Sequence, residues 1–254
     1  MMGSRQPTAA LIVIASEVLS GRTNDSHIGR LAHWSREQGL ALRFACVIPD
    51  DRQAIIDMVR LCESRFDHVF TAGGLGATHD DITVSAVAEA LGRPIERNVE
   101  AETVLRAYYG ERLRDAHLKL ADLPRGAELV LPDDRKAGVI RVGKVVLLAG
   151  IPDTADAMLA VLCDHMPRGP VTYQRTLGTD LPEEVIAAEL EAQQAFSAGC
   201  AIASYPLWRN GRPGTNLVLE GLDPTLLASC ADRLIGMIAG HGGNVIEGGI
   251  DREG

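Results

Sequence analysis

Cysteine is scarce and scattered in this sequence. The five cysteines among 254 residues lie at irregular spacings, and none belongs to a Cys-x-x-Cys pair. A structural zinc site needs clustered ligands and a disulfide framework needs paired cysteines, so neither is indicated. Reduced and mostly buried thiols are expected, which is typical of a cytoplasmic protein.

Basic residues are also in deficit. Lysine and arginine total 25 against 34 aspartates and glutamates, which gives a formal net charge of −9. A nucleic-acid-binding protein usually presents a net basic face, so no nucleic-acid partner is expected. One small anionic ligand stays compatible with this charge, because a local cluster or a bound metal reverses the field around a site.

Long apolar runs and several common catalytic motifs are absent. The run from Ala9 to Ala15 ends at Ser16 and Glu17 and is too short for a signal segment or a membrane span. It predicts a buried strand, and no membrane partner is expected. A serine nucleophile elbow, a GxGxxG fingerprint and a P-loop lysine are also missing, which disfavours those classes of site.

Apolar patterning predicts strands and helices that alternate along the first part of the chain. Strands are expected over residues 11–14, 42–48 and 67–71, and helices are expected to begin near residues 28, 52 and 81. This order is typical of an α/β fold with a doubly wound, mostly parallel sheet. A polar helix over 100–120, a hairpin over 139–149 and a helix over 152–165 complete the expected domain, residues 1–168.

A smaller second domain is expected at residues 169–254. The composition changes at Met166-Pro167-Arg168-Gly169-Pro170, which predicts a linker. Beyond it, the pattern predicts a strand at 173–177, a helix at 182–194, strands at 201–205 and 215–220, and a helix at 224–239. The order β-α-β-β-α indicates a small α+β domain.

The strongest local motif is a glycine-rich loop that follows the third expected strand. It reads Gly73-Gly74-Leu75-Gly76-Ala77-Thr78-His79-Asp80-Asp81. Glycines let backbone N–H groups approach phosphate oxygens, and a strand end next to a helix start is a favourable anion site. Asp80 and Asp81 would repel phosphate unless a divalent cation such as Mg²⁺ lies between them. The alternative is a tight turn with one aspartate capping a helix.

A second polar loop, residues 16–26, follows the first strand. In a doubly wound sheet it lies at the same carboxyl edge. Ser20, Gly21 and Arg22 are candidate anion ligands, with Arg22 able to supply a bidentate fork. Glu17 is a candidate ligand, base or structural acceptor, and Asp25 is a candidate catalytic residue whose alternative role is capping the next helix.

Together these segments resemble the molybdopterin-binding (molybdenum-cofactor-biosynthesis) domain, especially its CinA-like branch. That branch typically carries glycine-Asp-Glu-x-Leu-Ser-Gly-Arg-Thr-x-Asp, and this sequence has Ala15-Ser16-Glu17-Val18-Leu19-Ser20-Gly21-Arg22-Thr23-Asn24-Asp25. It also carries Thr-Gly-Gly-x-Gly-Pro-Thr-x-Asp-Asp-x-Thr, matched by the stretch from Thr71 to Thr83. Further matches are Val47-Ile48-Pro49-Asp50-Asp51, Leu148-Ala149-Gly150-Ile151-Pro152, Ser204-Tyr205-Pro206 and Gly214-Thr215-Asn216-Leu217-Val218-Leu219.

The resemblance implies a metal-dependent pyrophosphatase acting on a nucleotide diphosphate such as ADP-ribose or FAD. On this hypothesis Asp80 and Asp81 hold the cation, with Asp25 as a further candidate ligand, while Gly73, Gly74, Gly76 and Thr78 bind phosphate. Members of the family bind pterin or nucleotide diphosphates with a divalent metal and form dimers or trimers, so a homo-oligomer is expected. The alternatives are adenylyl transfer to molybdopterin and a non-catalytic pterin- or nucleotide-binding module.

Several positions depart from the family pattern. Ala77 replaces the usual proline of the loop, Ser16 replaces an acidic residue, and His27 stands where an asparagine is usual. Lys136, in a stretch that lacks the proline of the common Lys-Ala-Pro-Gly motif, is the lysine of greatest interest. These departures bear on activity more than on fold.

Overall fold

The computed structural model describes residues 5–132, 138–166 and 168–250. The chain divides into two compact units, Met1–Pro170 and Val171–Gly254. The division falls two residues after the boundary expected from the sequence. No helix among the described residues combines the length and apolar character needed to cross a membrane.

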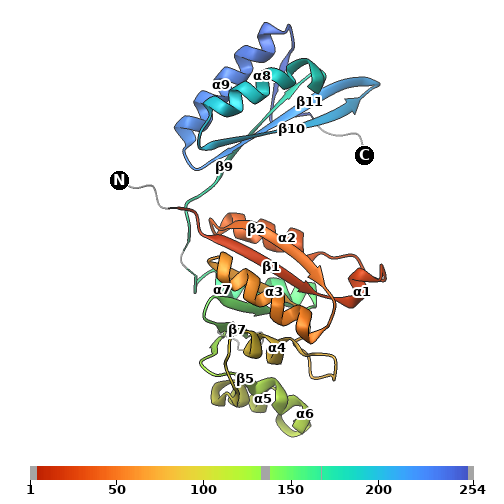
Figure 1. Cartoon of the computed structure of the whole chain (residues 1–254), viewed down its shortest axis with the longest axis vertical. Helices are drawn as coiled ribbons and strands as arrows, with labels where there is room; N and C mark the ends of the chain where they lie inside the picture. The colour runs from red at the N-terminus through yellow and green to blue at the C-terminus, as the bar shows by residue number, and fades with distance from the viewer. Residues whose placement is uncertain (1–4, 133–137, 167, 251–254) are drawn as a thin grey trace. The chain divides into compact units, whose positions relative to one another are not determined.

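The first unit is built on a mixed, mostly parallel sheet of six strands in the order β2-β1-β3-β8-β7-β6 (Figure 1). β1 (Thr8–Ile14), β2 (Ala41–Ile48), β3 (His68–Ala72) and β8 (Val145–Leu148) run parallel. β7 (Val139–Val142) is antiparallel to β8, and β6 (Glu128–Val130) is antiparallel to β7. The predicted α/β fold with a mostly parallel sheet is confirmed.

Helices cover both faces of this sheet, because the two faces of β1 are both apolar. Residues 9–14 are at most 3% exposed. Ala9, Leu11 and Val13 share a core with α2 (His27–Glu37) and α7 (Pro152–Leu162). The alternate residues Ala10, Ile12 and Ile14 share a second core with α3 (Arg52–Arg65) and α4 (Thr83–Ala90). Successive side chains of β1 therefore lie on opposite faces of the sheet, and each face packs against one of the two layers of helices.

The prediction of one long helix over residues 100–120 is wrong. The segment consists of α5 (Val99–Tyr109), η1 (Gly110–Arg112), α6 (Asp115–Leu118) and η2 (Lys119–Ala121). Gly110 has a φ of +51°, a left-handed conformation that ends α5. Two smaller differences are a helical turn, α1 (Ser16–Leu19), inside the expected polar loop and the start of α4 at Thr83 rather than at Asp81.

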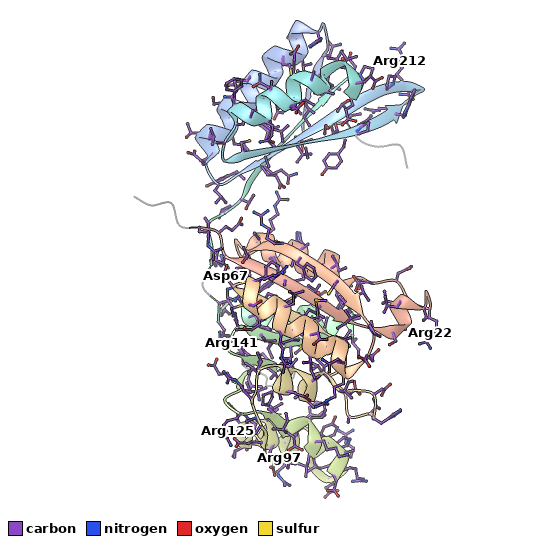
Figure 2. All side chains as sticks on the ribbon, in the orientation of Figure 1. Arg22, Asp67, Arg97, Arg125, Arg141 and Arg212 are labelled. Carbon is purple, nitrogen blue, oxygen red and sulfur yellow. The ribbon has the colours of Figure 1, made fainter. Side chains whose placement is uncertain are left out.

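These short helices belong to a small lobe, residues 95–124, which the sequence analysis did not predict. β4 (Ile95–Arg97) pairs with β5 (Asp122–Pro124) as a separate two-stranded sheet. Ala101, Ala121 and Leu123 form its buried core. The Arg97 guanidinium bonds Asp122 at 2.6 Å, and Figure 2 labels this arginine on the lobe. Strands of three residues carry too little periodicity to be recognised.

The second unit has the predicted β-α-β-β-α order. It consists of β9 (Tyr173–Thr179), α8 (Glu183–Phe196), β10 (Cys200–Arg209), β11 (Arg212–Gly221), α9 (Pro224–Gly240) and an additional strand, β12 (Val245–Glu247). Its antiparallel sheet has the order β10-β11-β9-β12. Asn210 and Gly211 join β10 to β11 with φ values of +52° and +70°, as a two-residue hairpin turn of the primed type requires.

A polar clamp fixes β1 against β3 where the two strands begin. The Thr8 N–H and hydroxyl donate to Asp67 Oδ2 at 2.8 and 2.7 Å, and the Asp67 N–H donates to Thr8 O at 3.1 Å. Arg5 adds a bond of 2.7 Å to Asp67 Oδ1. The bonds from the Thr8 backbone and side chain, aided by Arg5, hold the pKa of the Asp67 carboxyl below its ordinary value of 3.8.

Asp67→Asn is expected to reduce stability at neutral pH and to lose that effect in acid. A carboxyl whose folded-state pKa is lowered contributes stability above its unfolded pKa, and the contribution disappears as pH falls through the folded pKa. Urea unfolding at about pH 7 and about pH 3 measures the gap between variant and parent. Asp57→Asn, at a carboxylate that bonds the surface side chain of Gln53, is the control. An equal gap at both pH values would contradict the expectation.

Candidate functional site

The glycine loop lies where the parallel strands end. The Gly73 N–H donates to Leu148 O at 3.1 Å, which ties the loop to the end of β8. On the other side of β1, the Ser16 N–H donates to Asp50 Oδ2 at 2.9 Å, and the Asp50 N–H donates to Ser16 Oγ at 3.0 Å. The segments that follow β1, β2, β3 and β8 therefore share the carboxyl edge, where α/β proteins bind ligands.

The first two glycines are required by the space around them. Gly73 has a φ of +109°, and a Cβ there would lie 2.3 Å from Ile14 O. Gly74 has a φ of +66°, and a Cβ there would lie 2.2 Å from Thr83 Oγ1. Any other residue would meet both an unfavourable conformation and a clash. The backbone consequently passes close to β1 and α4 as it enters the loop.

Asp81 closes the loop on itself. Its Oδ2 accepts hydrogen bonds from the Thr78 N–H at 3.0 Å and from the Thr78 hydroxyl, and its own N–H donates to Thr78 O at 3.3 Å. The first turn of α4 is preceded by Ile82, which makes no side-chain capping bond. The capping alternative raised for these aspartates therefore does not describe Asp81, because its carboxylate organises the loop.

Asp80, unlike Asp81, is largely exposed to solvent. Its side chain is 68% exposed, and the neighbouring His79 is 97% exposed. The Thr78 side chain is the main cause of a lowered pKa at Asp80, with a smaller contribution from the charge of His79. Asp80 is thus an ionised, accessible carboxylate beside the internally bonded Asp81.

The loop after β1 is also ordered by its own contacts. The Ser20 hydroxyl donates to Glu17 O at 3.1 Å, Arg22 Nε donates to Ser20 Oγ at 3.1 Å, and the Arg22 N–H donates to Glu17 O at 2.9 Å. Gly21 supplies the left-handed residue of this turn, with a φ of +73°. Glu17, Ser20, Gly21 and Arg22 are all exposed, and Figure 2 shows Arg22 at the tip of the loop.

Asp25 caps helix α2. Its Oδ1 accepts from the His27 N–H at 3.1 Å, and its Oδ2 accepts from the Ile28 N–H at 3.0 Å. His27 Nδ1 lies 3.2 Å from the same Oδ1. The capping role weighed for this residue is therefore present, and it occupies both carboxylate oxygens.

A cavity of about 1050 Å³ opens beside the glycine loop. Gly76, Thr78 and Asp81 line it from the loop, and the small lobe and α7 line it from other sides. The lobe contributes Leu105, Tyr108, Tyr109, Lys119 and Leu123. Sequence reasoning missed these residues because residues 100–120 were assigned to one polar helix and Leu123 was assigned to no element. Two neighbouring tyrosines were the one signal that could have identified them.

The expected metal site and Lys136 are the two remaining candidates from the sequence. Within the described residues, no group of three or more His, Cys, Asp or Glu side chains is placed to hold a metal ion. Any cation at this site would have to be completed by a ligand's oxygens and by water. Lys136 lies outside the described residues.

Comparison with known proteins agrees with this geometry. Residues 10–169 match the model of a family described as "Probable molybdopterin binding domain". The chain belongs to this molybdopterin-binding domain family. Residues 171–243, in the second unit, match the model of the FAD synthase middle domain. The CinA-like resemblance inferred from the motifs is confirmed by a solved structure, the protein CinA from Thermoplasma acidophilum. It is 27% identical, covers 63% of this chain and 99% of that one, and has a TM-score of 0.58.

Two sequence relatives extend the comparison over both units. A "Probable FAD synthase" from Caenorhabditis elegans is 28% identical over 93% of this chain. The chain spans about half, 51%, of that relative's length. A protein from Aeropyrum pernix is 30% identical, with 79% of each chain covered. The alignment with the Caenorhabditis elegans relative therefore extends over most of both segments that match family models in this chain.

Removing the Asp25 carboxylate is expected to destabilise α2 through its cap. Asp25→Ala should lower the free energy of unfolding by about 0.5–2 kcal/mol, because two N–H groups lose their acceptor. Asp25→Asn keeps a good capping side chain and should change stability by much less. Urea unfolding of the two variants tests this, and equal losses in both would argue that the charge of Asp25 matters more than its cap.

Gly76→Ala is expected to break the Thr78–Asp81 contact. A Cβ at residue 76 would lie 2.4 Å from Asp81 Oδ2, so the carboxylate must move. Hydrogen exchange at the Thr78 amide should then accelerate roughly 5-fold or more, the scale of one net hydrogen bond. Gly29→Ala is the matched control, because no atom lies within 4 Å of a Cβ there. Unchanged exchange in Gly76→Ala would show that the contact does not protect this amide.

Proposed function

We propose that the protein is a metal-dependent pyrophosphatase that cleaves the diphosphate of a nucleotide such as ADP-ribose or FAD. The observation that carries the proposal is the glycine loop at the carboxyl edge of the sheet, with Asp81 fixed by Thr78 beside a large cavity. The chain is also similar, over 93% of its length, to a protein named probable FAD synthase, whose name points to a flavin dinucleotide.

Phosphate binding is assigned to the backbone and hydroxyl groups of the loop. Gly74 and Gly76 have no Cβ, so a phosphate oxygen can approach the backbone at these two residues. Gly73 is buried and its N–H donates to Leu148 O, so it positions the loop rather than binding phosphate through that group. The Thr78 hydroxyl donates to Asp81 in this structure, so donating to phosphate would require it to turn from Asp81 toward the ligand. Arg22, with Ser20 and Gly21 beside it, supplies a guanidinium that balances charge developing on the diphosphate.

The two loop aspartates fit a small divalent cation. Mg²⁺ is usually held by one or two carboxylates together with waters and substrate phosphates, rather than by a full set of protein ligands. Asp80 is exposed and ionised, and Asp81 retains Oδ1 outside its bonds to Thr78. A bound cation would neutralise diphosphate charge and polarise the bond to be cleaved. Glu17 remains a candidate for proton transfer at the edge of this site. Asp25 is not assigned to the chemistry, because both of its carboxylate oxygens accept backbone N–H groups at the start of α2.

The proposal also covers the class of ligand, the cellular location and the oligomeric state of the protein. The proposed ligand is a phosphate-bearing small molecule, either a nucleotide diphosphate or a pterin. The proposed location of the protein is the cytoplasm. Neither a nucleic acid nor a membrane is required as a partner. A homo-oligomer is proposed from the family resemblance.

Asp81→Asn is expected to reduce turnover at least ~100-fold, the scale of losing a major electrostatic contributor. Purified protein is assayed with ADP-ribose, FAD and NAD in the presence of Mg²⁺, Mn²⁺ or Co²⁺. Asp57→Asn, on the outer surface of α3, should leave turnover unchanged. Asp80→Asn separates the contribution of the accessible carboxylate from that of the loop-closing one.

Three results would move the assignment elsewhere. Full turnover in Asp81→Asn would remove this residue from the chemistry. Binding without cleavage under every metal would favour a non-catalytic pterin- or nucleotide-binding module. Such a module needs no metal, and the described residues contain no group of three or more candidate metal ligands. Adenylate transfer from ATP to molybdopterin, without cleavage of ADP-ribose, would favour the cofactor-synthesis activity.

A further inference from the structure

The cavity beside the glycine loop is far larger than a diphosphate needs. Its volume of about 1050 Å³ is at the upper end of small-molecule sites, which usually hold drug-sized ligands. Thr78 and His79 line it at the loop, and Tyr108, Tyr109 and Lys119 line it at the small lobe. A ligand bound by its phosphates at the loop would therefore extend its remaining part toward the lobe.

The lobe presents three aromatic rings in a fixed arrangement. The Tyr109 ring stacks on His117 with centroids 3.8 Å apart and an interplanar angle of 5°. His117 is itself held, because its Nδ1 accepts the Arg114 N–H at 3.1 Å. Tyr108 meets Tyr109 edge to face at 5.0 Å and 89°. The stacked His117 ring therefore holds the Tyr109 ring in place, and the edge-to-face contact with Tyr109 in turn positions the Tyr108 ring.

Tyr108 has a free aromatic surface. Its side chain lines the cavity, and the residue is 59% exposed, which is unusual for a large ring beside an apolar recess. Leu105, Leu123 and Ile140 line the same cavity. A planar ring entering here would remove apolar surface from water and stack on Tyr108, two effects that favour binding without depending on the exact ring.

Lys119 adds a cationic donor to this apolar recess. Across the described part of the chain its ammonium has no ion-pair partner, and the nearby Asp122 is held by Arg97 at 2.6 Å. An ammonium has three N–H donors and no acceptor, so it suits the oxygen or nitrogen acceptors at the edge of a heteroaromatic ring. The net charge of the chain is −9, so this cation does not belong to a general basic surface.

We propose that the cavity between the glycine loop and the small lobe binds the planar heteroaromatic ring of the ligand, with Tyr108 stacking on the ring and Lys119 donating to its edge. The inference rests on the proposed function for the placement of the diphosphate at the loop. It assigns specificity to residues that the phosphate chemistry does not use.

The test uses ring compounds that carry no phosphate. Riboflavin, adenosine and an unphosphorylated pterin are titrated into the 254-residue chain, with binding followed by ligand fluorescence or calorimetry. We expect at least one of them to bind, and Tyr108→Ala to weaken that binding roughly 5- to 150-fold, the range for loss of one stacked aromatic partner. Tyr108→Phe keeps the ring and should bind within about twofold of the parent.

Matched controls separate the recess from the rest of the protein. Tyr173→Ala removes a tyrosine of similar exposure, 42%, from the second unit and should leave ring binding unchanged. Lys119→Ala should weaken binding of the same probe, whereas Lys144→Ala, at a lysine that bonds Glu63 at 3.5 Å, should not. Circular dichroism confirms that each variant is folded.

The outcomes distinguish this inference from the pyrophosphatase proposal. Loss of ring binding in Tyr108→Ala supports the inference even if no nucleotide is cleaved. Failure of all three rings to bind, or equal binding by Tyr108→Ala and the parent, overturns it. Where cleavage is observed, an unchanged KM for both FAD and ADP-ribose in Tyr108→Ala overturns the ring site and leaves the pyrophosphatase intact. The identity of the ring that binds most tightly assigns the ligand class.

Discussion

The site depends on three backbone segments that lie too close together for side chains. At the carboxyl edge, a Cβ on Gly73 would lie 2.3 Å from Ile14 O, and a Cβ on Gly150 would lie 3.2 Å from Gly73 Cα. The ends of β1, β3 and β8 therefore meet backbone to backbone. Because this contact fixes where the loop leaves the sheet, the positions of Thr78, Asp80 and Asp81 all follow from it.

In the glycine loop, the carboxylate of Asp81 stabilises the backbone while the neighbouring carboxylate of Asp80 stays accessible to a ligand. Asp81 satisfies the Thr78 amide and hydroxyl, and such an internal bond holds a short loop in one conformation. Asp80 is exposed, and its pKa is lowered mainly by the Thr78 side chain. A fixed loop with an accessible charge is preorganised, so little ordering is needed when a ligand or cation arrives.

The sheet and its helices were largely predictable from the sequence, and the small lobe was not. The continuous apolar run of β1 indicated burial on both faces, and two separate cores confirm it. The glycine loop was recognisable because its residues are local in sequence. The capping function of Asp25 was foreseen as an alternative, but only hydrogen-bond geometry assigns it. The cavity was invisible because Leu105, Lys119 and Ile140 come together only through tertiary packing.

The way the small lobe joins the sheet has a consequence for how the fold can diversify. The lobe leaves the main unit after α4 and returns before β6, and its two ends pair with each other as β4 and β5. It is therefore an insertion with closed ends, and its buried residues Ala101, Ala121 and Leu123 pack against Val84, Leu129 and Ile140 of the main unit. Changes within residues 95–124 would therefore alter the lining of the cavity, provided that the apolar contacts of the lobe with α4, β6 and β7 are kept.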